Sequence, residues 1–282
     1  MPEGDTVHTL VLTLGPWLTG RRLTAVWVRG QAQSSLAGSQ ITGVTSRGKH
    51  LFVDLDDGYS LRSHLGLYGS WHRYRQDDPW QKPRRQASLV LDLGDRVYVC
   101  FNAREVELMR TQGFKALDQR NHLGPDLIRE VVEPESLLER ARKLLRADTL
   151  VVDLLLDQRI AAGIGNVYKS EILFITRRSP LLRLRDLSNT NLCQLYSTAG
   201  CLLNENLRGG PRRTRWPDDG RGLLWVYRRA TLPCLICGTA VRRDLLGRNP
   251  RSTYWCPDCQ TGPVPDRVSR ISVQGTIIGD RS

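Results

Sequence analysis

The sequence of 282 residues has no run of 18 or more apolar residues, so no membrane-spanning helix is expected. It also lacks a basic segment ahead of an apolar stretch at the N-terminus, where Glu3 and Asp5 lie instead, so no secretory signal is expected. Cysteine is scarce and odd in number, and seven cysteines without a signal argue against a disulfide framework. We therefore expect a protein of the reducing cytoplasm with no membrane partner.

Acidic residues are few relative to basic ones: 29 Asp and Glu stand against 41 Lys and Arg, for a net charge of +12. The hydrophobic fraction of 40% is ordinary for a globular protein. A basic excess of this size favours a polyanionic partner, most simply nucleic acid. A merely basic enzyme is the alternative. The length admits two or three domains, and no internal repeat is found.

The N-terminal third predicts a short helix followed by many strands. Residues 3–14 carry apolar side chains at helical spacing, and Gly15-Pro16 is expected to end this helix. From about 21 to 101 the pattern is β, with hairpins through Asp57-Gly58 and Gly94-Asp95. Many short strands with tight turns predict a sandwich or barrel.

The rest of the chain predicts helices and then short strands, which makes the fold class a multidomain α+β protein. Helices are expected at Ser136–Leu145, Leu150–Gln158, Val167–Phe174 and Asn189–Leu207. A surface loop is expected at Arg208–Gly222. The expected division is a β-sandwich domain 1–111, a linker 112–134, a helical domain 135–222, a zinc finger 223–262 and a tail 263–282.

Four cysteines near the C-terminus have the spacing of a metal site. Two Cys-x-x-Cys pairs stand 18 residues apart, which suits one tetrahedral Zn²⁺ with four protein ligands, a closed structural site. A redox pair or chance spacing is the alternative. The expected ligands are Cys234, Cys237, Cys256 and Cys259. The others stand singly in apolar surroundings and are expected to be buried: Cys100, Cys193 and Cys201.

The opening residues can carry covalent chemistry. Pro2 follows Met1, and a small second residue lets the Met be removed. The resulting α-amine would titrate near pH 8, against about 10.4 for a lysine, so more of it is a neutral nucleophile. A secondary amine can form an iminium ion with an aldehyde, and Glu3 offers a carboxyl for proton transfer. A frayed terminus is the alternative.

Three further stretches suit contact with a polyanion. Asn166 is expected to be the N-cap of the next helix, and the backbone N–H groups exposed by Gly163–Asn166 at that helix N-terminus would form an anion site. An ordinary helix–turn–helix hairpin is the alternative. Lys49 follows Gly48 at a strand start, where it can face a cleft or simply solvent. The arginines between the cysteine pairs would suit a nucleic-acid backbone: Arg242, Arg243, Arg248 and Arg251.

Apolar residues between glycines at a strand end form the remaining candidate. Leu67 and Tyr68 could wedge into the gap left by a flipped base, or could be core residues.

Together these stretches resemble the Fpg/Nei family of bifunctional DNA glycosylases, over nearly the whole chain to about residue 261. Met1-Pro2-Glu3-Gly4 resembles the endonuclease VIII (Nei) branch, and the opening to Val7 looks most like actinobacterial Nei-type proteins. Gln158–Tyr168 resembles the family's helix-two-turn-helix. Arg251–Cys256, with the four cysteines, resembles its zinc finger.

The resemblance implies a monomeric glycosylase and AP lyase acting on double-stranded DNA with an oxidised base, preferentially a pyrimidine, or an abasic site. Pro2 would attack C1′, and Glu3 would protonate the sugar's ring oxygen. β-elimination, or β,δ-elimination, would then cut the strand. Lys49 would be a third catalytic residue, which contacts a phosphate and assists release of the base. Asn166 and Arg251 would grip the phosphates that flank the lesion.

Two departures keep alternatives open. Thr6 stands where many members have glutamate, and Asp5 is its possible substitute. Gly66 stands where well-studied Nei proteins have glutamine ahead of Leu67. An AP lyase with little base excision, or a non-catalytic zinc-dependent damaged-DNA-binding protein, are the alternative functions.

Overall fold

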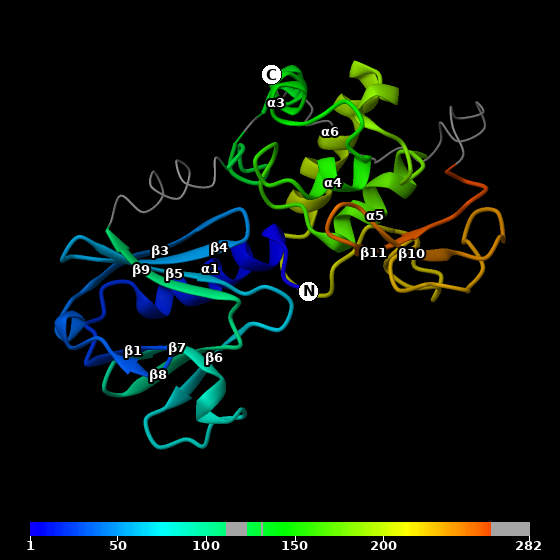
Figure 1. Cartoon of the computed structure of the whole chain (residues 1–282). Coiled ribbons are helices and arrows are strands. Elements are labelled where there is room, and N and C mark those ends of the chain that lie inside the picture. The colour runs from blue at the N-terminus through cyan, green and yellow to red at the C-terminus, as the bar shows by residue number, and fades with distance from the viewer. Residues whose placement is uncertain (111–122, 131, 261–282) are drawn as a thin grey trace, which may run out of the picture.

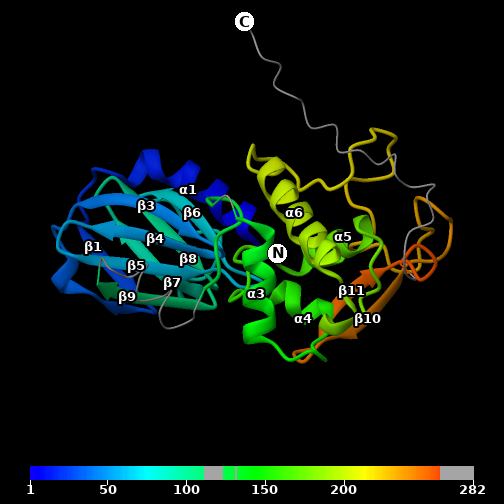
Figure 2. The same cartoon turned by 90° about the horizontal axis from the view of Figure 1, so that it is seen from above.

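The computed structural model describes residues 1–110, 123–130 and 132–260, and the chain forms two lobes with the N-terminus at their junction (Figures 1 and 2). The first lobe holds helix α1 and two β-sheets, and the second holds four helices and a β-hairpin. The expected fold class, a sandwich followed by a helical domain and a cysteine-bearing hairpin, is confirmed. Among the described residues, no helix is long and apolar enough to cross a membrane.

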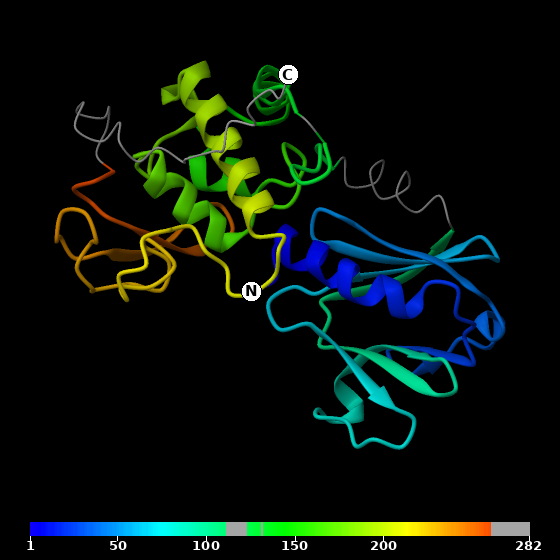
Figure 3. The same ribbon diagram turned by 180° about the vertical axis from the view of Figure 1, so that it is seen from behind.

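Helix α1 (Gly4–Leu18) continues past Gly15-Pro16, so the prediction that this pair ends the helix is wrong. Leu14 and Leu18 are both buried and four residues apart, so the apolar face extends through one more turn. Pro16 lacks only the N–H that would bond to the carbonyl of Leu12, whose side chain is exposed. Burial of Leu18 therefore outweighs the loss of one solvent-side hydrogen bond. Figure 3 shows α1 along the side of the sandwich.

The sandwich consists of antiparallel sheets in the orders β3-β4-β5-β9 and β2-β1-β7-β8-β6. Both predicted hairpins are confirmed as the pairs β4–β5 and β7–β8. A core of buried aliphatic side chains from α1 and the strands fills this lobe. The strands are β1 (Ala25–Val28), β2 (Gln31–Ala32), β3 (Ile41–Arg47), β4 (His50–Leu55), β5 (Tyr59–His64), β6 (Ser70–Arg75), β7 (Ala87–Asp92), β8 (Arg96–Phe101) and β9 (Glu105–Arg110).

The second lobe has its own aliphatic core, built mainly by its helices. These are α3 (Pro134–Leu144), α4 (Val151–Leu156), α5 (Asn166–Ile175) and α6 (Asn189–Glu205). The hairpin pairs β10 (Arg242–Leu246) with β11 (Arg251–Trp255) and packs on α5. A separate small core joins Phe174 of α5 to the residues around the cysteines. The predicted helices agree with these to within a few residues.

The predicted domain boundaries stay predictions. The linker residues 112–122 and the tail 263–282 lie outside the described residues. Within the rest of the expected linker, Asp126 and Leu127 are buried. Within the expected surface loop Arg208–Gly222, Thr214 and Arg215 are buried, so that loop is partly packed into the lobe.

The three single cysteines differ in burial. Cys100 is buried, as predicted, whereas Cys193 is half-buried and Cys201 is exposed. The prediction for Cys201 is wrong because α6 buries Ala199 and Leu202, and Cys201 lies off that buried stripe.

Candidate active site and metal centre

The carboxylate of Glu3 lies at the N-terminus of α5, where the two lobes meet. Its oxygens accept hydrogen bonds from the backbone N–H groups of Gly165 at 2.9 Å, Val167 at 2.7 Å and Tyr168 at 3.3 Å. Glu3 is completely buried. A carboxylate in this position satisfies orphan amides and complements the helix dipole. The predicted anion site therefore exists, and its occupant is the chain's own Glu3.

The prediction that Asn166 is the N-cap of α5 is wrong. Asn166 is the first helical residue, and Gly165 is the N-cap. The Glu3 carboxylate does the work of a capping side chain from 162 residues away along the chain. Capping in this way needs very close approach, because a Cβ on Gly165 would lie 2.4 Å from Cδ of Glu3. The Gly4 N–H also donates to the Gly163 carbonyl at 3.0 Å across the junction.

The terminal amine lies beside this carboxylate. Pro2 is half-buried just ahead of α1. Burial, and next the nearby Arg212 guanidinium, lower the pKa of the Met1 amine, which lies one residue ahead of Pro2. An amine of lowered pKa is more often neutral near pH 7 and so more nucleophilic.

Lys49 reaches the same place from the turn between β3 and β4. Burial lowers the pKa of Lys49 to about 8, and the charge of Glu3 opposes that shift. The turn is held by Asp126, whose carboxylate accepts the Gly48 N–H at 2.7 Å. The structure thus brings together the chain's N-terminus, the buried Glu3 carboxylate and the half-buried Lys49 from separate parts of the chain.

Asn166 and Arg251 lie where α5 meets the β10–β11 hairpin. The Asn166 side chain donates to the Ser252 carbonyl at 2.7 Å and accepts from Lys169 Nζ at 2.7 Å. The same ammonium donates to Thr253 Oγ1 at 2.8 Å. Arg251 is exposed at the start of β11. Sequence analysis missed Lys169, which is fully buried and whose pKa burial lowers to about 7.

Arg212 is a second residue that sequence analysis missed. Its guanidinium pairs with both carboxylate oxygens of Asp5, at 2.8 and 2.6 Å. Asp5 also accepts from the Tyr168 hydroxyl at 3.0 Å. Asp5 is therefore a buried ion-pair partner, which disfavours its use as a free substitute for the family's glutamate. No sequence spacing could have shown this pair, since 207 positions separate its members.

The loop between β5 and β6 presents Leu67 and Tyr68 to solvent, with exposed fractions of 52% and 75%. They are thus not core residues. Gly66 adopts a φ of +63°, and a Cβ there would lie 2.8 Å from Cβ of Arg104. This loop is built around a glycine, so a glutamine at position 66 would require Arg104 to move.

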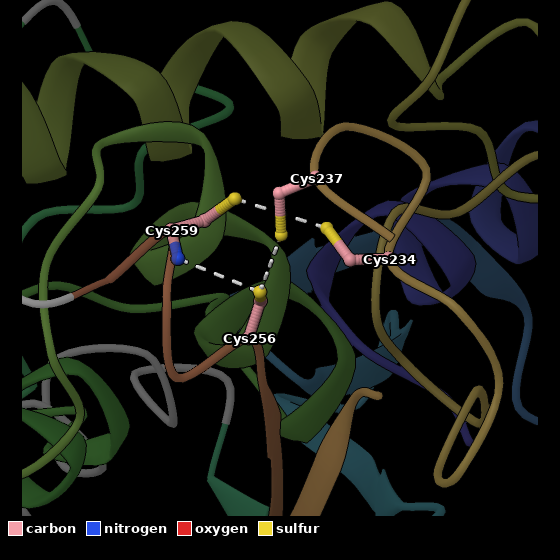
Figure 4. A group of neighbouring side chains, drawn as sticks. All are labelled: Cys234, Cys237, Cys256 and Cys259. Carbon is pink, nitrogen blue, oxygen red and sulfur yellow. Dashed lines mark hydrogen bonds between the residues drawn. The ribbon is translucent and has the colours of Figure 1, made fainter. Parts of the chain in front are cut away.

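The four cysteine sulfurs converge at the base of the β10–β11 hairpin (Figure 4). All lie within 4.8 Å of one another, with Cys234 and Cys259 3.8 Å apart and Cys237 and Cys256 3.4 Å apart. Tetrahedral thiolates about 2.3 Å from a zinc ion would be roughly 3.8 Å apart, so the donor set fits one metal ion. Four cysteine ligands fill all the positions of a tetrahedral site, which is the arrangement of a structural metal centre.

Comparisons with known proteins agree with this architecture. The formamidopyrimidine-DNA glycosylase N-terminal domain matches residues 1–108, and the H2TH domain of the same enzymes matches residues 123–216. A probable endonuclease 8 2 of Streptomyces coelicolor is 39% identical, over 97% of this chain and 99% of that protein. The DNA-(apurinic or apyrimidinic site) lyase Nei2 of Mycolicibacterium smegmatis is 36% identical, over 93% and 99%.

A similar solved structure is formamidopyrimidine-DNA glycosylase of Lactococcus lactis bound to DNA containing an abasic site. It has a TM-score of 0.79 at 22% identity, covering 92% of this chain and 100% of that one, and shows the shared fold. The chain belongs to the Fpg/Nei family of DNA glycosylases. Its relatives named above carry endonuclease 8 and Nei2 names and come from actinobacteria, in line with the resemblance of its opening residues.

Proposed function

We propose that this protein is a bifunctional DNA glycosylase and AP lyase of base excision repair, with Pro2 as its nucleophile after removal of Met1. The convergence of the terminal amine, the Glu3 carboxylate and Lys49 where the lobes meet carries this proposal. DNA binding alone requires neither a buried carboxylate nor an N-terminus held next to it. An oxidised pyrimidine is the proposed substrate base, as the resemblance of the opening residues to the Nei branch implies.

In the proposed reaction the neutral Pro2 nitrogen attacks C1′ of the damaged nucleotide. The base leaves with the bonding electrons and takes a proton from solvent. Glu3 accepts the proton of the Pro2 nitrogen and passes it to the ring oxygen, while the nitrogen lone pair opens the C1′–O4′ bond to give the iminium ion. Removal of a C2′ proton then expels the 3′ phosphate, which completes β-elimination. Whether δ-elimination follows depends on a second proton abstraction.

Several exposed or cleft-facing groups would hold the DNA. Lys49, Asn166 and Arg251 surround the Glu3 site and would contact phosphates flanking the lesion. Leu67 and Tyr68 would fill the space left by the flipped nucleotide. These contacts would offset the few kcal/mol needed to bend the duplex and unstack a base.

The remaining parts of the proposal concern the setting. One structural Zn²⁺ on Cys234, Cys237, Cys256 and Cys259 would hold the hairpin that carries Arg251 against α5. The partner is double-stranded DNA with a damaged base or an abasic site, bound by a monomer. The bacterial relatives favour action in the cytoplasm.

Two oligonucleotides tested side by side distinguish the proposal from a lyase without base excision. One carries an oxidised pyrimidine, and the other carries a preformed abasic site at the same position. We expect both strands to be cut. Cutting of the abasic strand alone would leave only the lyase, and binding without cutting of either would leave the non-catalytic alternative.

A further inference from the structure

The loop that follows α6 brings a guanidinium to the first turn of α1. Arg212 donates to Asp5 through Nε and Nη2, and its Nη2 also donates to Thr6 Oγ1 at 2.9 Å. The Arg212 side chain is only 13% exposed. A planar guanidinium that forms a bidentate pair with both oxygens of one carboxylate is held in one orientation. Its charge is therefore fixed in space.

Other residues hold the pair from behind. The Tyr168 ring lies under the guanidinium, 4.8 Å from its carbon to the ring centroid, and the Tyr168 hydroxyl donates to Asp5. The loop itself is clamped by the Asn206 side chain, which donates to the Arg213 carbonyl at 2.8 Å and accepts the Arg213 N–H at 2.7 Å. This much support is more than a solvated surface charge receives.

Arg212 also reaches the atoms bonded to the proposed nucleophile. Its Nη1 lies 3.3 Å from the Met1 carbonyl oxygen, and the carbonyl carbon of Met1 is bonded to the Pro2 nitrogen. The same Nη1 lies 3.9 Å from Glu3 Oε1. The guanidinium is thus close to both the nucleophile and its proton carrier.

The terminal amine is faced by charges of both signs. With Met1 in place, Arg212 and, more weakly, Arg228 disfavour the protonated form of the Met1 amine, whereas Glu3 and Asp5 favour it. Removal of Met1 would leave the Pro2 amine next to the same Arg212 guanidinium. Burial acts in the same direction as the arginines. Lys49 lies in the same cluster and also feels the Arg212 charge. Arg212 and Asp5 therefore act on the amine in opposite directions, from one rigid ion pair.

On the basis of the function proposed above, we propose that Arg212 is a positioning residue whose fixed positive charge keeps the Pro2 amine in its neutral, nucleophilic form, with Asp5 as the opposing charge. This arrangement occupies the place where Thr6 replaces the glutamate of many family members. A merely structural ion pair would lower stability when broken without changing the pH at which the amine reacts.

The test measures iminium formation on an abasic-site oligonucleotide in single turnover with borohydride, from about pH 5.5 to about pH 9, a range that brackets an ordinary α-amine pKa. For Arg212→Gln we expect the midpoint of the rate profile to rise by about one pH unit, with a roughly tenfold lower rate below the midpoint. Arg212→Lys keeps the charge and should stay near the wild-type midpoint. Arg208→Gln removes an exposed charge on the same loop and should leave the profile unchanged.

Asp5→Asn supplies the opposite sign. It removes a negative charge while keeping the side-chain shape, so the midpoint should move to lower pH. If folded Arg212→Gln follows the wild-type profile, the inference is wrong. If Arg212→Gln does not fold, Asp5→Asn decides: an unchanged or higher midpoint contradicts the inference. If wild-type protein forms no cross-link at any pH, it is the proposed function that fails.

Discussion

Gly165→Ala perturbs the junction of the two lobes without replacing a residue that carries chemistry. At φ −124° and ψ −160° the backbone of Gly165 is extended, which alanine adopts without strain. The added Cβ would lie 2.4 Å from Cδ of Glu3, so one of the two must move. The change therefore isolates the contact between Glu3 and the start of α5.

The expected cost combines two effects. Overpacking in a buried site costs about 1–3 kcal/mol. Displacing the carboxylate weakens hydrogen bonds to a charged acceptor, each contributing about 1.5–3 kcal/mol. A total of about 3–5 kcal/mol would lower the melting temperature by roughly 6 °C or more, at about 2–4 °C per kcal/mol for a chain of this size. A carboxylate misplaced by about 1 Å would also slow strand cleavage by roughly a hundredfold.

Gly200→Ala is the matched control, because Gly200 lies within α6 and a Cβ there meets nothing closer than 4.0 Å. It should raise stability by about 0.5–1 kcal/mol. Thermal melting and hydrogen exchange of the Val167 and Tyr168 amides measure the effect, since both amides donate to Glu3. Wild-type melting, exchange and cleavage in Gly165→Ala would refute the argument.

Two further predictions follow from the hairpin and the β5–β6 loop. Metal chelation or Cys256→Ser should abolish DNA binding while amide protection in the sandwich persists, because each lobe has its own core. The control Cys201→Ser lies outside the cysteine cluster and should bind DNA normally. Full DNA binding without metal would contradict the hairpin's role. Replacing both Leu67 and Tyr68 by alanine should slow excision from duplex DNA at least about tenfold, since wedge residues offset roughly 1–3 kcal/mol of unstacking. The equally exposed Leu181→Ala should have no effect, and an unaffected double variant would exclude the wedge.

Features that depend on neighbouring residues were predictable from the sequence. Asp57-Gly58 and Gly94-Asp95 supply the turn chemistry that two hairpins need, so both pairs of strands were located correctly. The cysteine spacing likewise contains the geometry of a tetrahedral site, and the four sulfurs do converge.

Features that depend on distant residues were not predictable in this way. Asn166 is a good N-cap by type, but Glu3 displaces it from that role by approaching from the other lobe. Gly15-Pro16 is a strong local stop signal that burial of Leu18 overrides. Arg212 carried no signal of its own, because its partner Asp5 lies at the other end of the chain. Such contacts come from tertiary packing, which leaves no periodicity.

Borohydride trapping on an oligonucleotide with one abasic site tests the central claim most directly. Reduction of the iminium would join protein and DNA through a stable amine, and mass analysis of the cross-linked peptide would locate the linkage. We predict a cross-link at the nitrogen of residue 2 in protein lacking Met1. A Pro2→Gly variant that keeps one residue ahead of position 2 has an amide nitrogen there and should form no cross-link at that residue. A linkage at Lys49 or another lysine, or no cross-link in DNA-bound protein shown to lack Met1, would contradict the account.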